Sequence, residues 1–155
     1  MLEDYDDFVE QSDSPRHAIN CMLSAYHMAE WIWGDWLQDD YATWTTLKIR
    51  DKVSFLAWVD GAQPWFKITQ AVANGSKHFA SKLANTKSSP TYVEDGYVED
   101  GYQARMLEVQ TDDGKWVEAI VLVEDVVMFW QDFFKAYRPQ ETLPQPRNTF
   151  TVMPD

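Results

Sequence analysis

The segment AVANGSKHF contains the first group of residues suited to chemistry. Asn74 and His78 are four residues apart, so a helix over this segment places them on one face, with Lys77 beside them. Lysine and asparagine can neutralise and orient a phosphate while a histidine moves a proton. These groups are the minimum for metal-independent attack of a ribose 2′-hydroxyl on its own phosphate. Two further residues extend the polar line, Lys67 and Gln70. The alternative interpretation is an amphipathic helix whose polar side faces water.

A second polar and aromatic line runs through the segment HAINCMLSAYHMAEWIWGD. Its members are Asn20, Ser24, His27, Trp31 and Asp35. On a helix these side chains lie on successive turns and can face a pocket. Glu30 is three residues from His27 and can hold its ring for a general acid or base role. The alternative is a histidine that is hydrogen-bonded at a contact between helices.

Other catalytic and metal-binding signatures are missing from the sequence. It has no Walker A loop and no GxGxxG, HExxH or GxSxG motif. The three histidines lack the short paired spacing of a metal site, so we expect no metal and no cofactor. A run of aromatic residues could stack a base, although core packing is the alternative. The run consists of Trp31, Trp33, Trp36, Tyr41 and Trp44.

Charge is distributed unevenly along the chain. The net charge is −12, which argues against nucleic acid as a partner because phosphate binding requires cations. Residues 1–47 contain ten acids and one base, and residues 88–155 contain thirteen acids and five bases. Residues 48–87 contain seven bases and two acids, enough for a modest anion-binding surface if the fold gathers them. The acidic flanks could instead bind a basic protein.

Length and composition indicate a single folded domain. The chain has 155 residues, of which 45% are hydrophobic and 15% aromatic, so a wholly disordered protein is excluded. No apolar run approaches the roughly 20 residues of a membrane span, and the acidic start does not resemble an export signal. We therefore expect a cytoplasmic protein that does not contact a membrane. Cys21, the single cysteine, lies in an apolar helical pattern and is expected to be buried.

Hydrophobic periodicity predicts four helices and a hairpin. Ser14 and Pro15 are a typical helix start, and the apolar stripe that follows predicts a long helix through residue 37. Its stripe consists of Ala18, Cys21, Met22, Ala25, Ala29, Ile32 and Trp36. A second helix is expected over 41–58, ended by Asp60 and Gly61, with core positions Trp44, Leu47, Val53 and Leu56. A third is expected from Pro64 to about Leu83, with Trp65, Ile68, Val72 and Phe79 on one face.

The second half of the chain contains the only clear β signal. Asp113-Gly114 is a strong turn signal, and it predicts a hairpin of residues 103–110 and 115–123. A last helix is expected to start at Glu124 and to end near Arg138. Residues 85–90 are predicted as a loop, and the tandem repeat of Tyr-Val-Glu-Asp-Gly at 92–101 as a turn-rich segment.

The two ends of the chain are expected to contribute little to the core. The first ten residues carry too much charge to pack well, and residues 139–155 are proline-rich and predicted to be disordered. Residues 1–138 then form one domain, a mainly α four-helix bundle with an inserted hairpin at about 103–123.

Two segments resemble a group of small bacterial helical proteins that is similar to the HEPN superfamily. They are SAYHMAEWIWGDW and AVANGSKHF, and the similarity extends over about residues 15–135. The resemblance implies a four-helix bundle, a homodimer and metal-independent RNase activity. HEPN RNases carry an arginine four to six residues before a histidine on the third helix. Here His78 matches the histidine, but Asn74 stands nearest to the arginine position, so either Lys77 or Lys67 substitutes or the protein is inactive.

The sequence therefore leads to two functional hypotheses. The first is a HEPN-like domain that binds RNA or a nucleotide and cleaves RNA weakly. In it Asn74, His78 and His27 are catalytic, and the substrate-binding residues are Lys77, Lys67, Gln70, Asp35, Trp31 and Ser24. The second is a non-catalytic phage-defence or counter-defence protein that sequesters a protein partner or a nucleotide signal.

Overall fold

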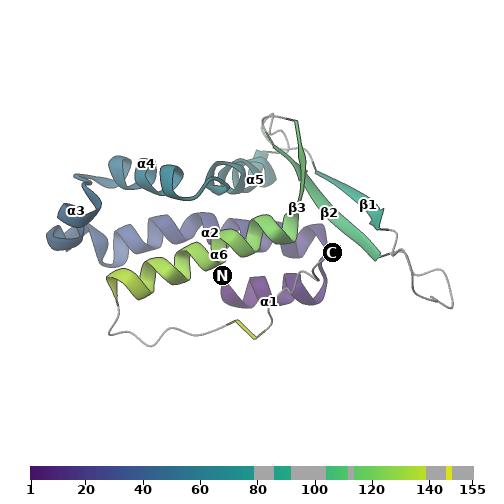
Figure 1. The fold of residues 1–155 in the computed structure, drawn as a ribbon, viewed down its shortest axis with the longest axis horizontal. Helices are drawn as coiled ribbons and strands as arrows, with labels where there is room; N and C mark the ends of the chain where they lie inside the picture. The colour runs from purple at the N-terminus through teal and green to yellow at the C-terminus, as the bar shows by residue number, and fades with distance from the viewer. Residues whose placement is uncertain (79–85, 92–103, 112–113, 139–145, 148–155) are drawn as a thin grey trace.

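The computed structural model describes residues 1–78, 86–91, 104–111, 114–138 and 146–147, and it is mainly helical (Figure 1). The helices are α1 (Leu2–Glu10), α2 (Pro15–Asp35), the 3-10 turn η1 (Leu37–Asp39), α3 (Tyr41–Leu47), α4 (Lys52–Ala62), α5 (Phe66–His78) and α6 (Ala119–Tyr137). The strands are β1 (Thr86–Thr91), β2 (Ala104–Gln110) and β3 (Trp116–Glu118). They form a small antiparallel sheet that precedes the last helix.

The long helix α2 is the centre of the molecule and packs against α1, α5 and α6 (Figure 1). It begins as predicted, because Ser14 Oγ accepts a hydrogen bond from the backbone N–H of His17 at 3.4 Å and Pro15 occupies the first turn. Six of the seven predicted stripe residues are buried. Trp36 is the exception, since it lies at the C-cap and is half-buried.

The expectation that the first ten residues do not pack is wrong, because α1 packs against the bundle. Tyr5 and Phe8 are three residues apart, so they share one face, and both are buried against the bundle. Tyr5 also donates a hydrogen bond to Glu124 Oε1 at 3.2 Å. Asp6 is only 3% exposed, and its carboxylate accepts a hydrogen bond from Arg147 Nε at 3.2 Å. The acidic residues therefore occupy the outer face or are paired, and they do not prevent docking.

The tail is described at only two residues, Pro146 and Arg147, and Arg147 lies against α1 through its contact with Asp6. The prediction of disorder for the other tail residues lies outside the described part of the chain, as does the tandem repeat at 92–101.

The predicted helix over 41–58 is in fact two helices. Lys48 adopts a left-handed conformation with φ 57°, which ends α3, and Ile49 is buried in the link. Asp51 and Ser54 then form a capping box that starts α4. The expected stop at Gly61 is wrong as well, because α4 continues to Ala62. Val53 is 76% exposed and is not a core residue.

The hairpin is present, and a third strand lies beside it. Residues Val109 and Val117 are paired across β2 and β3, and Gly114 has φ 82° in the connecting turn. Strand β1 pairs with the other edge of β2, so the predicted loop over 85–90 is wrong from residue 86 on. Its sequence TKSSPT has no apolar alternation, which is why the pattern did not indicate a strand.

The predicted second hairpin strand is too long and the last helix too short. The strand ends at Glu118, and α6 begins at Ala119, five residues before the predicted start. Residues 119–123 are continuously apolar, and a run of this kind occurs both in buried strands and in buried helices. In the structure Ala119, Ile120, Leu122 and Val123 are all buried within the bundle.

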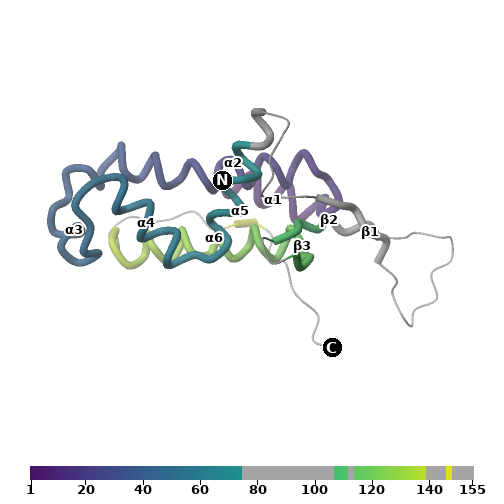
Figure 2. The backbone as a smooth tube through the Cα atoms, turned by 90° about the horizontal axis from the view of Figure 1, so that it is seen from above, coloured from purple at the N-terminus to yellow at the C-terminus, as the bar shows by residue number. Residues whose placement is uncertain are grey.

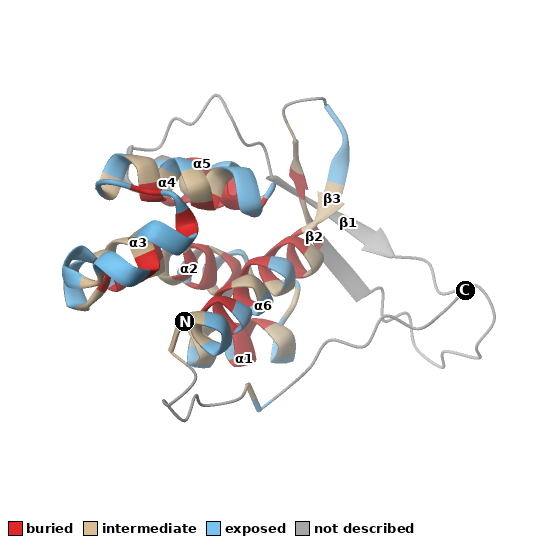
Figure 3. Ribbon diagram, turned by 60° about the vertical axis from the view of Figure 1, so that its left-hand side comes forward, coloured by how far each residue is buried: buried red, intermediate tan, exposed pale blue. Residues whose placement is uncertain are grey.

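The core consists of two clusters of buried side chains. The first, here called the aliphatic end, joins α1, the first half of α2, α5, β2 and the start of α6. The second, here called the aromatic end, joins the second half of α2 with α3, α4 and the remainder of α6. Seen from above, α3 lies far from the strands along the axis of α2 (Figure 2). Buried residues follow the inward faces of α1, α2 and α6 (Figure 3). None of the described helices has the length and apolarity needed to cross a bilayer.

Candidate functional site

The residues predicted on the third helix lie on α5, which packs against α2. Asn74 is exposed, and His78 is the last residue of the helix, one turn later. The side chains of Lys77 and His78 lie outside the described part of the structure. Gln70 donates a hydrogen bond from Nε2 to the hydroxyl of Tyr26 on α2, at 3.2 Å. Of the predicted site residues on α5, Gln70 is the one whose side chain makes a described hydrogen bond to α2.

Three cations of the locally basic region, Arg50, Lys52 and Lys67, lie beside carboxylates. Lys67 Nζ lies 2.9 Å from Asp60 Oδ2, and Lys52 Nζ lies 3.0 Å from Glu30 Oε1. Arg50 Nε is 3.9 Å from the neighbouring Asp51. Among the described residues, this face therefore offers a phosphate less uncompensated positive charge than the sequence count indicated.

His27 belongs to a chain of polar contacts on the surface of α2. Its Nδ1 lies 3.2 Å from Glu30 Oε2, and Glu30 also accepts the hydrogen bond from Lys52. The hydrogen bonds from Lys52 and His27 hold the pKa of Glu30 below its ordinary value of 4.5. On its other side, the imidazole stacks on Trp31 with ring centroids 6.3 Å apart and planes at 29°. The chain thus fixes the position of the Trp31 ring.

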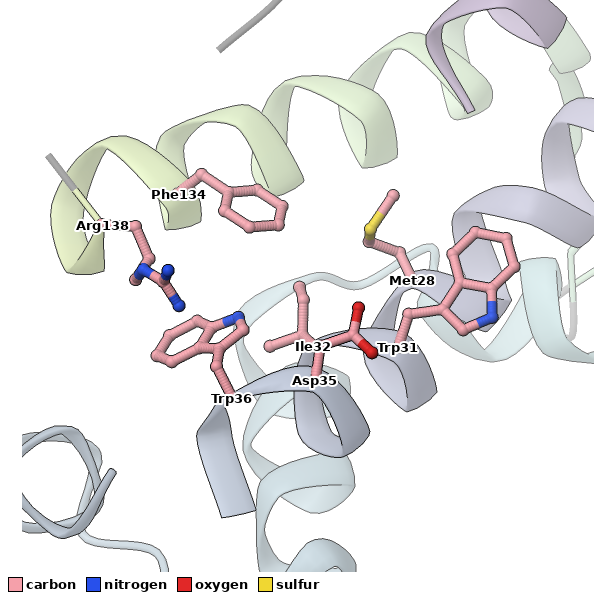
Figure 4. Close-up of a pocket in the computed structure, with 7 residues that line it drawn as sticks. All are labelled: Met28, Trp31, Ile32, Asp35, Trp36, Phe134 and Arg138. Carbon is pink, nitrogen blue, oxygen red and sulfur yellow. The ribbon is translucent and has the colours of Figure 1, made fainter. Parts of the chain in front are cut away.

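A pocket of about 410 Å³ lies between the C-terminal half of α2 and the end of α6 (Figure 4). It is lined by Met28, Trp31, Ile32, Asp35, Trp36, Phe134 and Arg138. Two predicted site residues, Trp31 and Asp35, are therefore in its wall, and Trp31 contacts a third, His27. The volume is within the range of roughly 300–1,000 Å³ that is typical of small-molecule sites.

The pocket combines aromatic walls with one acidic side chain, Asp35, and one basic side chain, Arg138. Trp31 is 50% exposed, which leaves ring surface available for stacking. Asp35 is exposed, and its carboxylate has no hydrogen bond or ion pair within the described part of the chain. The guanidinium of Arg138 lies 4.9 Å from the centre of the Trp36 ring, a cation–π contact. Trp36 Nε1 is buried and finds no acceptor among the described residues.

Sequence reasoning missed four of the lining residues. Met28 and Ile32 fall in or beside the apolar stripe of α2, which predicts core positions, whereas Trp36 belongs to the aromatic run that could stack a base. Phe134 and Arg138 come from α6, about 100 residues later, and no local pattern connects them to α2. Helical spacing offered one signal, since residues 28, 31, 32 and 35 share a face of α2.

Ser24 does not belong to this site. Its Oγ donates a hydrogen bond to Asp4 Oδ2 at 2.7 Å, and Asp4 also pairs with the N-terminal amine at 3.2 Å. Ser24 therefore joins α2 to α1 and has a structural role. The described residues include no cluster of three or more His, Cys, Asp or Glu side chains that could hold a metal ion. Burial raises the pKa of the Cys21 thiol to about 12, so this cysteine is not a nucleophile at neutral pH.

Comparisons with protein-family models, with curated proteins and with solved structures found no significant match. The case for a function therefore depends on the chemistry of the pocket and of α5.

Proposed function

We propose that the chain binds a nucleotide in the pocket between α2 and α6, either as a free molecule or as an unpaired residue of RNA. The observation that carries this proposal is the half-exposed ring of Trp31 at the edge of a pocket that also contains a carboxylate and a guanidinium (Figure 4). Trp31 and Arg138 lie on opposite sides of the pocket, with Asp35 between them (Figure 4). A base and a phosphate are separated in the same way within a nucleotide.

Each part of the pocket matches one part of such a ligand. Stacking of a base on an aromatic ring contributes about 1–3 kcal/mol and is possible for every base. The guanidinium of Arg138 can form paired hydrogen bonds with phosphate oxygens. Asp35 can accept hydrogen bonds from the edge of the base. The His27–Glu30–Lys52 chain holds Trp31 in place, so little side-chain entropy is lost on binding.

Charge favours a short ligand over a long RNA. The net charge of −12 repels a polyanion, and Lys52 and Lys67 are already paired with carboxylates. A single nucleotide requires only one cation, and the guanidinium of Arg138 lines the pocket. Binding of this kind without turnover corresponds to the sequestering protein that the sequence also suggested.

Weak RNase activity in a HEPN-like, homodimeric four-helix bundle is a second candidate function. The supporting observation is that Asn74 is exposed on α5 one turn before His78. In this proposal His78 moves the proton and Asn74 orients the phosphate. Single-stranded RNA incubated with the native chain should be cleaved, and His78→Ala should abolish turnover. Absence of cleavage by the native chain would exclude this candidate without affecting nucleotide binding.

Calorimetric titration of the full chain with the four nucleoside monophosphates, and with a short single-stranded RNA, tests the primary proposal. We expect Trp31→Ala to weaken binding by about tenfold or more, which is the loss of one stacking contact. Trp116→Ala is the matched control, because this tryptophan is also partly exposed but lies on β3, in the sheet. If the native chain binds none of these ligands at millimolar concentration, the proposal is wrong. Tighter binding of RNA than of monophosphates would identify RNA as the source of the nucleotide.

A further inference from the structure

We infer that the pocket selects guanine among the four bases and that Asp35 determines this selectivity. The inference rests on the proposed nucleotide binding and specifies its substrate class. The inference depends on the position of the Asp35 carboxylate and on its having no hydrogen bond or ion pair among the described residues. It also depends on the hydrogen-bonding pattern of base edges.

Asp35 and Trp31 are placed to act on the same base. They are four residues apart on α2, so their side chains lie on one face with Cβ atoms about 5–6 Å apart. The carboxylate of Asp35 is oriented toward the interior of the pocket, beside the Trp31 ring (Figure 4). A base that stacks on Trp31 therefore presents its edge to Asp35.

Among the described residues, Asp35 makes no hydrogen bond or ion pair. Asp35 is the last residue of α2, where the negative end of the helix dipole makes a carboxylate unfavourable. Within the described residues no cation or hydrogen-bond donor compensates this cost, and no ion pair joins Asp35 to Arg138. An exposed, unpaired carboxylate that faces a pocket is thus available to a ligand.

A carboxylate distinguishes guanine from the other bases because it can only accept hydrogen bonds. The Watson–Crick edge of guanine has two adjacent donors, N1–H and the N2 amino group, which match the two oxygens. Adenine and cytosine each present one amino donor next to a ring nitrogen that is an acceptor. Uracil presents one N–H between two carbonyls. In these three bases an acceptor faces the carboxylate, which costs binding energy.

The remaining lining residues are consistent with this orientation. Arg138 is held over the Trp36 ring at 4.9 Å, so positive charge stays on the side of the pocket away from Trp31. The phosphate of a guanine nucleotide can reach that side while the base contacts Asp35. Met28 and Phe134 supply apolar surface around the base.

The first test uses the native chain and needs no variant. Calorimetric titration should show that GMP binds about tenfold or more tightly than AMP, CMP or UMP, since each of these lacks one charge-assisted hydrogen bond. IMP differs from GMP only by the missing N2 amino group, and it should bind about tenfold more weakly than GMP. Equal affinity for GMP and IMP, or tighter binding of AMP, would overturn guanine selection while nucleotide binding stands.

The second test assigns the selectivity to Asp35. Asp35→Asn replaces one acceptor by a donor, so the side chain no longer matches the two adjacent donors of guanine. We expect GMP affinity to fall by about tenfold or more and the preference for GMP to be lost, because every base presents one donor next to one acceptor to the amide. Asp39→Asn is the matched control, since Asp39 is an exposed carboxylate on η1 that does not line the pocket. If Asp35→Asn keeps the native preference for GMP, Asp35 is not the determinant. If no monophosphate binds the native chain, the proposed function itself fails, and the two failures are thereby distinguished.

Discussion

The aliphatic and aromatic ends of the bundle differ in the side chains that fill them. At the aliphatic end, Leu122, Val123 and Val109 are fully buried among mostly aliphatic residues, and Tyr5 and Phe8 are the buried rings of this cluster. At the aromatic end, rings contact one another from α2, α3, α4 and α6. Examples are the pairs Trp33–Trp44 at 5.4 Å and Phe55–Phe133 at 6.0 Å between centroids.

The pocket lies at the aromatic end, where aromatic side chains form much of the core. Flexible or branched aliphatic chains interdigitate and leave few voids, whereas rigid rings meet in tilted or offset pairs. Trp36, the C-cap residue of α2, and Phe134 of α6 both line the pocket (Figure 4). The comparison shows that both ends contribute buried side chains to the core, and that the aromatic end also carries the pocket.

The largest expected effect comes from truncating the residue that fixes the aromatic end. Trp130 is fully buried, and its Nε1 donates a hydrogen bond to the backbone oxygen of Ala25 at 2.8 Å. Trp130→Ala should lower the free energy of unfolding by about 3–5 kcal/mol, because it creates a large cavity and leaves that oxygen without its donor. Urea denaturation followed by circular dichroism measures this loss. In the fraction of the Trp130→Ala variant that remains folded, nucleotide affinity should fall as well.

Leu122→Ala makes the comparison between the two ends quantitative. This residue is also fully buried, but at the aliphatic end, and the substitution should cost about 2–5 kcal/mol. Nucleotide affinity should then stay within about twofold of the native value, since separated sites act independently. Equal loss of affinity in both variants would show that the two ends do not differ in function.

The sequence predicted those parts of the fold where pattern and packing agree. The stripe of α2 and the Asp-Gly turn are clear local signals, and the structure confirms both. The errors are at positions where tertiary contacts decide. Tyr5 and Phe8 dock α1 despite its charge, and β1 forms only because β2 offers a free edge. The apolar run from Ala119 fits a strand and a buried helix equally well, so only packing resolves it.

The part of the candidate site that lies on α2 was predictable from helical spacing. His27, Trp31 and Asp35 lie on one helix, so their spacing alone placed them on a common face. Arg138 and Phe134 come from α6, and their approach to α2 depends on how the two helices cross. The sequence counts charges but does not show that Lys52 and Lys67 have carboxylate partners.

A smaller effect is expected at Glu30, which supports the wall of the pocket. Its pKa is lowered in the folded state by Lys52 and His27, so ionised Glu30 stabilises the fold above the ordinary value of 4.5. That contribution is lost as the pH falls through the lowered pKa. Glu30→Gln should therefore be less stable than the native chain at pH values above 4.5, and the difference should vanish once the pH is below the lowered pKa of Glu30. Because the side chain is 41% exposed, we expect less than about 1 kcal/mol after screening.

Thermal unfolding at a series of pH values, repeated in 1 M salt, measures this effect. Salt should reduce the difference at pH 6, since the contacts are close to the surface. Nucleotide affinity should fall a few-fold in the same variant, because His27 and the Trp31 ring lose their support. A pH-independent stability difference would mean that Glu30 acts through packing and not through its charge.

The smallest effect on stability is expected at Trp36, where the two roles of the aromatic end can be separated. Its buried Nε1 has no acceptor among the described residues, and an unsatisfied donor costs about 1–3 kcal/mol. Trp36→Phe removes that donor but also removes buried ring volume, so the two terms oppose each other. We expect the free energy of unfolding to change by less than about 1 kcal/mol in urea denaturation. Nucleotide affinity is the more informative readout, because Phe keeps a ring beneath Arg138 and lacks only the N–H. Unchanged affinity would mean that the ring alone positions Arg138, whereas a loss of about tenfold would mean that a ligand reaches the N–H and accepts its hydrogen bond.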